Sequence, residues 1–478
     1  MNRQNSSYYI AFLPIIILII LLACSVYIYG SDSLSGPNQL ALLFSAAISA
    51  LIGVIYYNVK WKNILNSIEK SISSTTSAMI ILLLIGSLAG TWLISGVIPA
   101  MIYYGLQILN PKIFLFASCI ICAIISLSTG SSWSTIATIG IALLGIGKAL
   151  EIPEGLVAGS IISGAYFGDK ISPLSDTTNL ASAVAGTDLF EHIKYMMYTT
   201  VPSFIISLII FMFLGNNYAV ESHNNITILL DTIQNTFVIN KWLFVLPLLV
   251  ILLIIKKVPA IPTLLVATIL GAIFAIIFQP NIILSISESK ILSVKTYYIS
   301  LINTMSNGVS IQTENQLINS LLKTGGMSGM LNTIWLIICA MSYGGVMEAC
   351  GFLREITKPI IKYAKTTGSL ITTTAGTCIF FNITTSDQYL SIVVPGRMFH
   401  KTYKNHKLSS ENLSRTLEDS GTVTSVLIPW NTCGATQSAI LGVGTLTYLP
   451  YCFFNIITPF TTIIYGYLGI KIKKILKT

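Results

Sequence analysis

The sequence predicts an all-α polytopic membrane protein with about ten transmembrane helices, two re-entrant hairpins and an inverted structural repeat of discontinuous helices. Three observations support this: an apolar composition, recurring apolar runs of spanning length, and polar clusters that break four of the runs. Of the 478 residues, 53% are hydrophobic and 9% charged, with a mean hydropathy of +0.77. A soluble domain carries about 25% charged residues, so most of this surface must face lipid.

Apolar runs of membrane-spanning length recur along the chain. A helix needs about 20 residues to cross the hydrocarbon core, and eight uninterrupted runs approach or meet this length: 9–30, 38–56, 76–98, 197–214, 241–255, 260–279, 331–353 and 450–470. Two further spans, 154–187 and 417–446, are interrupted by charge and proline. The runs 111–149 and 367–399 are each broken in the middle by a polar cluster, which is typical of re-entrant hairpins.

Basic residues are concentrated in a few segments between these spans. They comprise Lys60, Lys62, Lys70, Lys256, Lys257, Arg354, Lys358, Lys362, Lys365, the stretch 400–407, Lys471, Lys473, Lys474 and Lys477. With both termini in the cytoplasm, all of them lie inside, as the positive-inside rule expects. The external segment 280–330 is the exception, but long loops weigh little in setting topology. The net charge of +9 therefore indicates a membrane orientation and not nucleic-acid binding.

Two parts of the chain repeat the same order of features. Segment 84–105 resembles 341–363, and a hydroxyl-rich cluster follows each at a similar spacing, at 128–132 and 384–387. This divides the chain into 1–75 (two spans and a linker), 76–214 (first repeat), 215–330 (inter-repeat spans and loop) and 331–478 (second repeat). The repeats begin on opposite sides of the membrane. Inverted repeats with broken helices indicate a secondary transporter whose site lies near the midplane.

The first interrupted span holds two carboxylates at membrane depth, Asp169 and Asp176. Pro173 should break the helix and leave the backbone carbonyls around Asp169 and Lys170 without their helical partners. The side chains of Ser175, Thr177 and Asn179 supply further oxygen ligands for a hard cation. A carboxylate inside a membrane is a functional candidate by default. It can hold a proton or a sodium ion but not both, and this competition is an antiport mechanism. The alternative is an ion pair that only locks helices, between Asp169 and Lys170 or between Asp176 and a lysine.

The second interrupted span repeats this composition. Asp419 is a candidate coupling carboxylate, whereas Glu418 also fits the solvated start of a helix, where the dipole favours acidic residues. Pro429 precedes Asn431 and Thr432, which we predict as ligands. We place sodium at Asp176, Asn179 and Asn431.

The two hairpin tips, Ser128–Ser134 and Thr384–Gln388, are rich in hydroxyl groups. We predict that they bind ions or substrate through Ser131, Ser132, Thr385 and Ser386, and that Asp387 adds a coupling carboxylate. Helix capping is the alternative, and free N–H groups at half-helix N-termini would suit an anionic substrate.

Two charged residues near the second hairpin complete the candidates. Glu348 is a further proton carrier or an ion-pair partner. Arg397 pairs with Asp387 or Glu348, neutralises an anionic substrate, or extends to the membrane surface.

These stretches resemble the NhaC sodium/proton antiporter family, which also includes sodium-lactate/malate-proton antiporters. The resemblance rests on Thr129–Trp133, Gly168–Asn179, Ser386–Tyr389, Pro395–Met398, Leu417–Thr422 and Ile428–Gly434. Ser134 and Thr436 depart from the family pattern at positions that shape the site. The resemblance implies a multi-pass protein of the bacterial inner membrane, with both termini cytoplasmic on our topology. It also implies a homodimer with a scaffold and a moving transport domain.

Sodium/proton exchange is the leading function, with Na+ and H+ as transported ions, no cofactor and no enzymatic activity. The alternative is a sodium- and proton-coupled exchange of an organic anion such as lactate or malate, with Arg397 or Lys170 as its counter-ion. A channel is the third class, but broken inverted repeats favour alternating access.

The sequence contains one Cys-x-x-Cys, formed by Cys119 and Cys122. It has no nearby histidine and no second cysteine pair, so we interpret these two residues as buried free thiols.

Overall fold

The structure is a computed structural model, and it describes residues 3–29, 33, 35–108, 110–216, 223–256, 258–287, 291–313, 319, 322–353, 355–356 and 364–475. Lys257, Arg354, Lys358, Lys362 and Lys477 of the predicted basic segments lie outside these residues. The described chain is almost entirely helical. The strands β1 (Val309–Ser310) and β2 (Lys323–Thr324) form a two-residue antiparallel ladder. The prediction of an all-α polytopic membrane protein is confirmed.

The helices of the first half follow the predicted order. They are α1 (Arg3–Tyr29), α2 (Pro37–Tyr57), α3 (Trp61–Ser74), α4 (Thr76–Ile94), α5 (Val97–Ile108), α6 (Pro111–Thr129), α7 (Ser132–Thr135), the π-helix η2 (Ile136–Gly140), α8 (Ile141–Ala149), α9 (Glu154–Ile171), α10 (Asp176–Ala185) and α11 (Leu189–Gly215).

The second half continues with shorter pieces. They are α12 (His223–Thr236), η4 (Lys241–Phe244), α13 (Val245–Ile255), α14 (Ala260–Phe278), α15 (Pro280–Ile286), α16 (Val294–Asn307), η5 (Ser328–Met330), α18 (Leu331–Ala349), α20 (Thr367–Thr384), α21 (Gln388–Asn405), α22 (Ser410–Leu417), the π-helix η6 (Glu418–Thr422), α23 (Val423–Ser425), α24 (Thr432–Leu441), α25 (Thr445–Tyr448), η7 (Leu449–Tyr451) and α26 (Phe453–Leu468).

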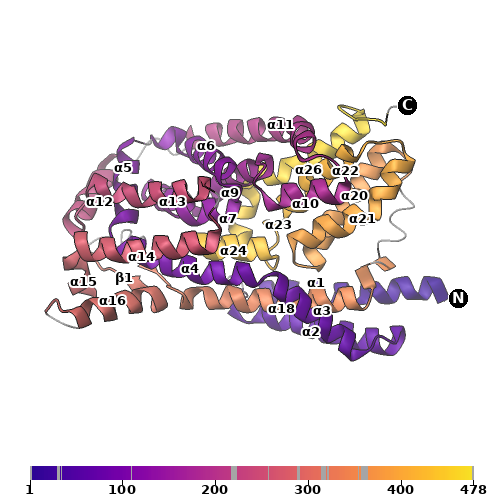
Figure 1. Ribbon diagram of the computed structural model, residues 1–478, viewed down its shortest axis with the longest axis horizontal. Coiled ribbons are helices and arrows are strands. Elements are labelled where there is room, and N and C mark those ends of the chain that lie inside the picture. The colour runs from indigo at the N-terminus through magenta and orange to yellow at the C-terminus, as the bar shows by residue number, and fades with distance from the viewer. Residues whose placement is uncertain are drawn as a thin grey trace.

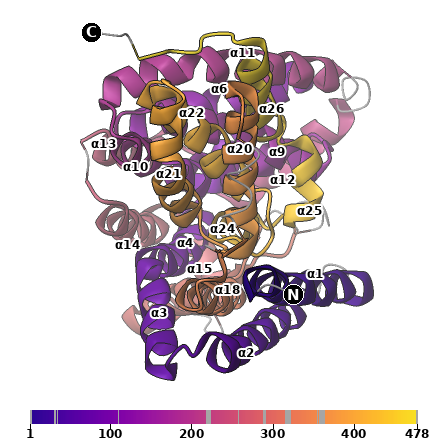
Figure 2. The ribbon, with the colours of Figure 1, turned by 90° about the vertical axis from the view of Figure 1, so that its right-hand side faces the viewer.

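Most helices run along the long axis of the molecule and form two groups (Figure 1). In one group α18 packs on α2 and α3, α2 on α1, and α4 on α14 and α16. In the other α6 packs on α9 and α11, and α26 on α11 and α20. Figure 2 shows the first three helices and α18 on one side of the molecule, with α20, α21 and α22 on the other. Large apolar side chains such as Leu248 and Phe213 remain exposed, as a lipid-facing surface requires.

Eight helices in the described residues are long and apolar enough to cross a membrane: those within 10–29, 37–57, 76–94, 111–129, 132–149, 189–215, 260–278 and 328–349. A ninth candidate, Leu230–Thr236 with Lys241–Leu253, is bent by 91°. The predicted spans 154–187 and 417–446 are not among these helices, because each is broken into separate helices that are too short to cross a membrane alone. Both arms of the stretch 111–149 are long enough to cross by length and composition.

Small residues let α6 and α9 approach closely. A Cβ at Gly164 would lie 2.0 Å from the carbonyl oxygen of Cys119, and one at Gly168 would lie 2.2 Å from that of Ala123. Ser126 adds an interhelical hydrogen bond of 2.6 Å to the Ala165 carbonyl. Two glycines four residues apart are a common device for close helix contact in membranes, and here they place the end of α9 beside the end of α6.

The C-terminal segment 469–475 ties the ends of α11 and α22 together. Leu408 pairs with Lys474 in an isolated β-bridge, and Ser409 N–H donates to the Lys473 carbonyl at 3.0 Å. Tyr195 of α11 also donates its hydroxyl hydrogen to the Lys471 carbonyl. We call residues 469–475 the C-terminal strap.

Candidate functional site

The four predicted helix breaks all occur, and three of them line one cavity between the two helix groups. The breaks lie at 130–131, 172–175, 385–387 and 426–431. A cavity of about 430 Å³ is lined by residues of the first three breaks and by Thr432, with 74, 75, 77, 78, Ile81 and 258–260 on its opposite wall. The opposite wall comes from the α3–α4 and α13–α14 connections, so both groups of helices contribute to the cavity.

Asp169 joins the end of α9 to the first hairpin tip. Its Oδ2 accepts hydrogen bonds from Ser132 N–H at 3.0 Å and from Ser132 Oγ at 2.7 Å. Gly130 makes this turn possible because it ends α6 in the left-handed region, with φ 68°. The Asp169 side chain lines the cavity, and the Ser175 hydroxyl lies beside its carboxyl group.

Asp387 and Asp176 lie at two further helix N-termini on the cavity wall. Asp387 caps α21 by accepting from Leu390 N–H at 2.8 Å and is 3% exposed. Asp176 begins α10 and is exposed to the cavity. Three carboxylates from three helix breaks thus face one space. In the described part of the chain no lysine, arginine or histidine lines this space.

The fourth break is connected to the second hairpin tip by hydrogen bonds of the backbone and of side-chain amides. Thr432 N–H donates to the Ser386 carbonyl at 2.9 Å, and Ser386 adopts a left-handed φ of 60°. Asn431 caps α24 through Cys433 N–H at 3.0 Å and donates to Asn382 at 3.1 Å. The tip 385–387 and the start of α24 therefore form one hydrogen-bonded unit.

Lys170 and Asp419 form a fully buried ion pair behind the cavity. Asp419 Oδ2 also accepts from Thr199 Oγ1 at 2.7 Å. The pair links α9 to η6 and α11, and neither charge lines the cavity.

The structure brings together seven of the predicted site residues on the cavity wall: Ser131, Asp169, Ser175, Asp176, Thr177, Asp387 and Thr432. It places nine elsewhere: Ser132, Lys170, Asn179, Glu348, Thr385, Ser386, Arg397, Asp419 and Asn431. Of these, Thr385, Ser386 and Asn431 belong to the breaks, and Ser132 directly follows the first break; all four support the wall from behind.

Two details of the predicted first break differ in the structure. The carbonyls expected to be free are satisfied, since Ser172 N–H donates to Asp169 O at 3.1 Å and Thr178 Oγ1 to Lys170 O at 2.9 Å. The predicted sodium set of Asp176, Asn179 and Asn431 does not converge on one point. Asn179 is exposed and bonds the Pro173 and Ser175 carbonyls, because broken helix ends recruit amides as caps.

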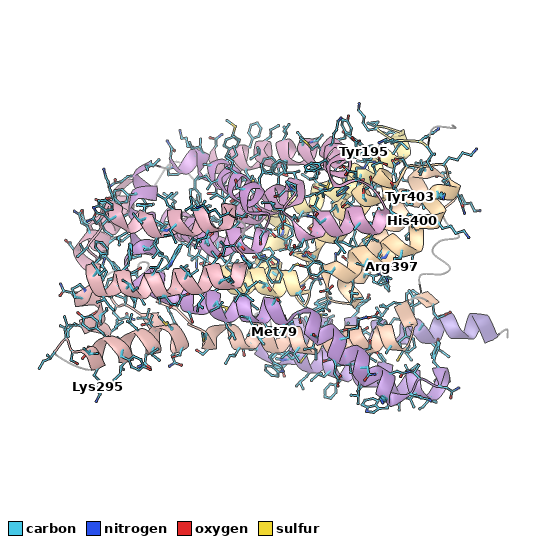
Figure 3. All side chains as sticks on the ribbon, viewed as in Figure 1. Met79, Tyr195, Lys295, Arg397, His400 and Tyr403 are labelled. Atoms are coloured by element: carbon cyan, nitrogen blue, oxygen red, sulfur yellow. The ribbon has the colours of Figure 1, made fainter. Side chains whose placement is uncertain are left out.

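Glu348 and Arg397 lie apart from the cavity. Both side chains are exposed, Glu348 near the end of α18 and Arg397 in the middle of α21. Figure 3 shows Arg397 on the same helix as His400 and Tyr403. Within the described residues Arg397 has no ion pair with Asp387 or Glu348. Of the three alternatives stated for Arg397, extension to the surface is the one that matches this position.

Sequence reasoning missed the opposite wall of the cavity. The hydroxyl-rich run 71–77, at the end of α3 and the start of α4, was an available signal for Ser74, Thr75 and Ser77. Gln388 and Tyr389 also line the cavity and directly follow the predicted Asp387. Residues 258–260 carry no polar signal, and only packing places them there.

The model of the Na+/H+ antiporter family matches residues 164–470. The chain is 37% identical to the Na(+)/H(+) antiporter NhaC of Alkalihalophilus pseudofirmus, with 91% of each chain covered. It is 38% identical to the malate-2H(+)/Na(+)-lactate antiporter of Bacillus subtilis, covering 91% of this chain and 90% of the relative. It is 34% identical to the arginine/ornithine antiporter ArcD of Halobacterium salinarum, covering 98% of this chain and 93% of the relative.

Proposed function

The chain belongs to the Na+/H+ antiporter family, and from this premise we propose that its three-carboxylate cavity exchanges sodium ions for protons. Asp169, Asp176 and Asp387 hold the cation, with Ser131, Ser175, Thr177 and Thr432 as neutral oxygen ligands around it. Carboxylate and hydroxyl oxygens suit a hard cation. The observation that carries this proposal is the charge of the cavity wall, which in the described residues is acidic only.

The same wall argues against lactate or malate as the substrate. An organic anion would face three carboxylates, and like charges at close range cost several kcal/mol in a partly desolvated site. Lys170 is engaged with Asp419, and Arg397 is exposed away from the cavity. Two of the helix N-termini are also occupied, since Asp169 accepts from the start of α7 and Asp387 caps α21.

The arrangement of the breaks supports an inverted repeat with two re-entrant hairpins. α6 with α7–α8 and α20 with α21 each turn at a hydroxyl-rich tip beside the cavity, and α9–α10 and α22–α24 are the broken spans that follow them. Both termini are cytoplasmic in this proposal. The cavity then opens to the cytoplasm, because its walls at 74, 75, 77, 78 and 258–260 closely follow the basic residues Lys70 and Lys256.

Proteoliposomes with an internal pH dye test the exchange. We expect an outward sodium gradient to drive proton uptake in buffer without any organic acid, and lactate or malate to leave the rate unchanged. A strict requirement for lactate or malate would overturn sodium/proton exchange as the function.

Single neutral replacements test the cavity. Asp169→Asn, Asp176→Asn and Asp387→Asn should each reduce sodium-driven proton movement at least about tenfold, since each removes a charge from the cation site. Glu154 is an exposed carboxylate at the start of α9 that pairs with Lys148 at 3.0 Å. Its replacement, Glu154→Gln, is the matched control and should exchange like the wild type. Normal exchange by all three aspartate variants would contradict the assignment.

A further inference from the structure

A second pocket, of about 300 Å³, lies between the start of α11 and the C-terminal strap. Figure 3 shows Tyr195 of its wall toward the same end of the long axis as His400 and Tyr403. The charged and aromatic residues of the wall are Glu191, Lys194, Tyr195 and Tyr198 of α11 and Lys471 and Lys473 of the strap. Because this wall holds three lysines and one glutamate, it attracts an anion, in contrast to the acidic wall of the cation cavity.

Two of the three lysines are free to bind a ligand. Glu191 of the pocket wall and Glu411 of α22 both pair with the third, Lys473. Lys194 and Lys471 are exposed, and in the part of the chain that the structure describes neither of them forms an ion pair. An anion that enters the pocket therefore meets two ammonium groups without counter-charges.

The strap side of the pocket is held in place by hydrogen bonds below it. The Lys471 carbonyl accepts from the Tyr195 hydroxyl and from Arg415 Nη1 at 3.2 Å. The Lys473 N–H donates to the Tyr195 oxygen at 3.1 Å. Lys471 Nζ lies 4.7 Å from the centroid of the Tyr198 ring, a cation–π contact on the pocket wall. The backbone of the strap is thus fixed against α11, which positions its lysines at the pocket.

A buried cation behind the pocket wall is the second indication of an anion. Arg415 is fully buried, and its guanidinium carbon lies 4.6 Å from the centroid of the Tyr195 ring. Among the described residues it forms no ion pair, and its Nε and Nη2 have no hydrogen-bond partner. A buried charge without a counter-charge is costly. The charge of Arg415 therefore adds to the attraction of the pocket for an anion.

An apolar stripe on α11 distinguishes a lipid from a free anion. α11 has 27 residues and is about 40 Å long, so its first turns extend beyond a hydrocarbon core of about 30 Å into the headgroup region. Ile205, Ile209 and Met212 are exposed and continue the helix face that carries Lys194 and Tyr198. A headgroup in the pocket therefore has an apolar surface for its acyl chain directly along the same helix.

We propose that this pocket binds an anionic phospholipid. The ammonium groups of Lys194 and Lys471 contact the phosphate, and one acyl chain lies along the α11 stripe. Basic pockets between transmembrane helices bind anionic headgroups in this way. A zwitterionic lipid carries its own cation on the headgroup and binds more weakly. The pocket is separate from the cation cavity, so this proposal does not depend on sodium/proton exchange.

Native mass spectrometry of the purified full-length protein tests the proposal. The protein is delipidated in a neutral detergent and titrated with dioleoylphosphatidylglycerol or dioleoylphosphatidylcholine. We expect the first phosphatidylglycerol to bind more tightly than the first phosphatidylcholine. The pair Lys194→Gln with Lys471→Gln should weaken phosphatidylglycerol binding roughly 10- to 30-fold, because each lysine near a headgroup contributes a comparable attraction. Equal affinity of the wild type for the two lipids would overturn the proposal.

Two matched variants separate the pocket from general surface charge. Lys401→Gln with Lys404→Gln removes two exposed lysines of α21 that lie outside the pocket, and it should leave the affinity unchanged. Lys194→Arg with Lys471→Arg keeps both charges and should bind within about threefold of the wild type. Both glutamine pairs should unfold at the wild-type temperature without lipid, because all four lysines are exposed.

Two further outcomes would contradict the lipid site. A Lys194→Gln with Lys471→Gln protein that binds phosphatidylglycerol like the wild type would exclude the pocket. Glycerophosphoglycerol, the headgroup without acyl chains, should bind at least about tenfold more weakly than the lipid. If it bound as tightly, the occupant would be a free phosphate ester and not a phospholipid.

Discussion

At the scale of single residues, the buried Lys170–Asp419 ion pair has two possible roles: it only holds helices together, or Asp419 takes part in proton coupling. Variants of the pair distinguish these two roles. Removing one partner leaves an uncompensated buried charge, which costs about 3–5 kcal/mol. We expect Asp419→Asn to lower the thermal unfolding midpoint in detergent markedly. The double variant Lys170→Met with Asp419→Leu should recover most of the loss, because apolar replacement of a buried ion pair is often neutral.

The same two variants, Asp419→Asn and the double variant, also test whether Asp419 takes part in coupling sodium to proton movement. If the pair only joins α9 to η6 and α11, the double variant keeps sodium/proton exchange after reconstitution. If Asp419 carries a proton, as its position in the sequence suggested, exchange is lost although stability returns. A single variant Asp419→Asn that is as stable as the wild type would contradict the helix-lock role itself.

At the scale of structural elements, the C-terminal strap is held by an ion pair whose contribution depends on pH. Lys473 Nζ lies 2.5 Å from Glu411 and 3.7 Å from Glu191. Burial alone raises the pKa of Glu411, but the hydrogen bonds from Lys473 and Ser409 outweigh it, so this pKa is below its ordinary value of 4.5. The hydrogen bond to Glu411 raises the pKa of Lys473 above 10.5.

These shifts predict where Glu411 stabilises the protein. A lowered carboxyl pKa stabilises the folded state above the ordinary value, and this contribution is lost as pH falls through the folded pKa. Glu411→Gln should therefore lower the unfolding midpoint at neutral pH by the equivalent of about 0.5–1 kcal/mol, because the lysine is half exposed. The difference from wild type should vanish well below pH 4.5. Thermal scans across pH measure it, and a difference that persisted in acid would exclude the ion pair as its cause.

The elements also show what the sequence could predict. All four breaks were predicted, because glycine, proline and hydroxyl clusters end helices by local chemistry. Capping was predicted only as the alternative role of the two hairpin tips. Asn179 and Asn431, which were predicted as ligands, serve local helix ends, and Asp169 accepts from a tip 37 residues away in the sequence. The partner of Lys170 is Asp419, 249 residues distant. Such pairings depend on tertiary packing, which one sequence does not encode in a local pattern.

At the scale of the whole molecule, the labelled residues in Figure 3 define a topology test. Lys295 lies at one end of the long axis, His400 lies toward the other, and Met79 lies between them on α4. Cys24 is the one exposed cysteine of the eight, so Cys24→Ser provides a background without an exposed thiol. In intact cells, Lys295→Cys should react with a membrane-impermeant maleimide, whereas His400→Cys should react only in inside-out vesicles.

Ser77→Cys in the same background reports which side the cavity faces. Ser77 is exposed and lines the wall opposite the three carboxylates. If this conformation is open to the cytoplasm, the maleimide should modify Ser77→Cys from the inside, and sodium should slow the reaction by occupying the cavity. The control is His400→Cys, which lies outside the cavity and should react at a rate that does not depend on sodium. Modification of Ser77→Cys from the outside alone would contradict the cytoplasmic opening. Because alternating access requires the two helix groups to move relative to one another, the side from which this one thiol is modified reports which conformation is present, and its sodium dependence reports occupation of the cavity.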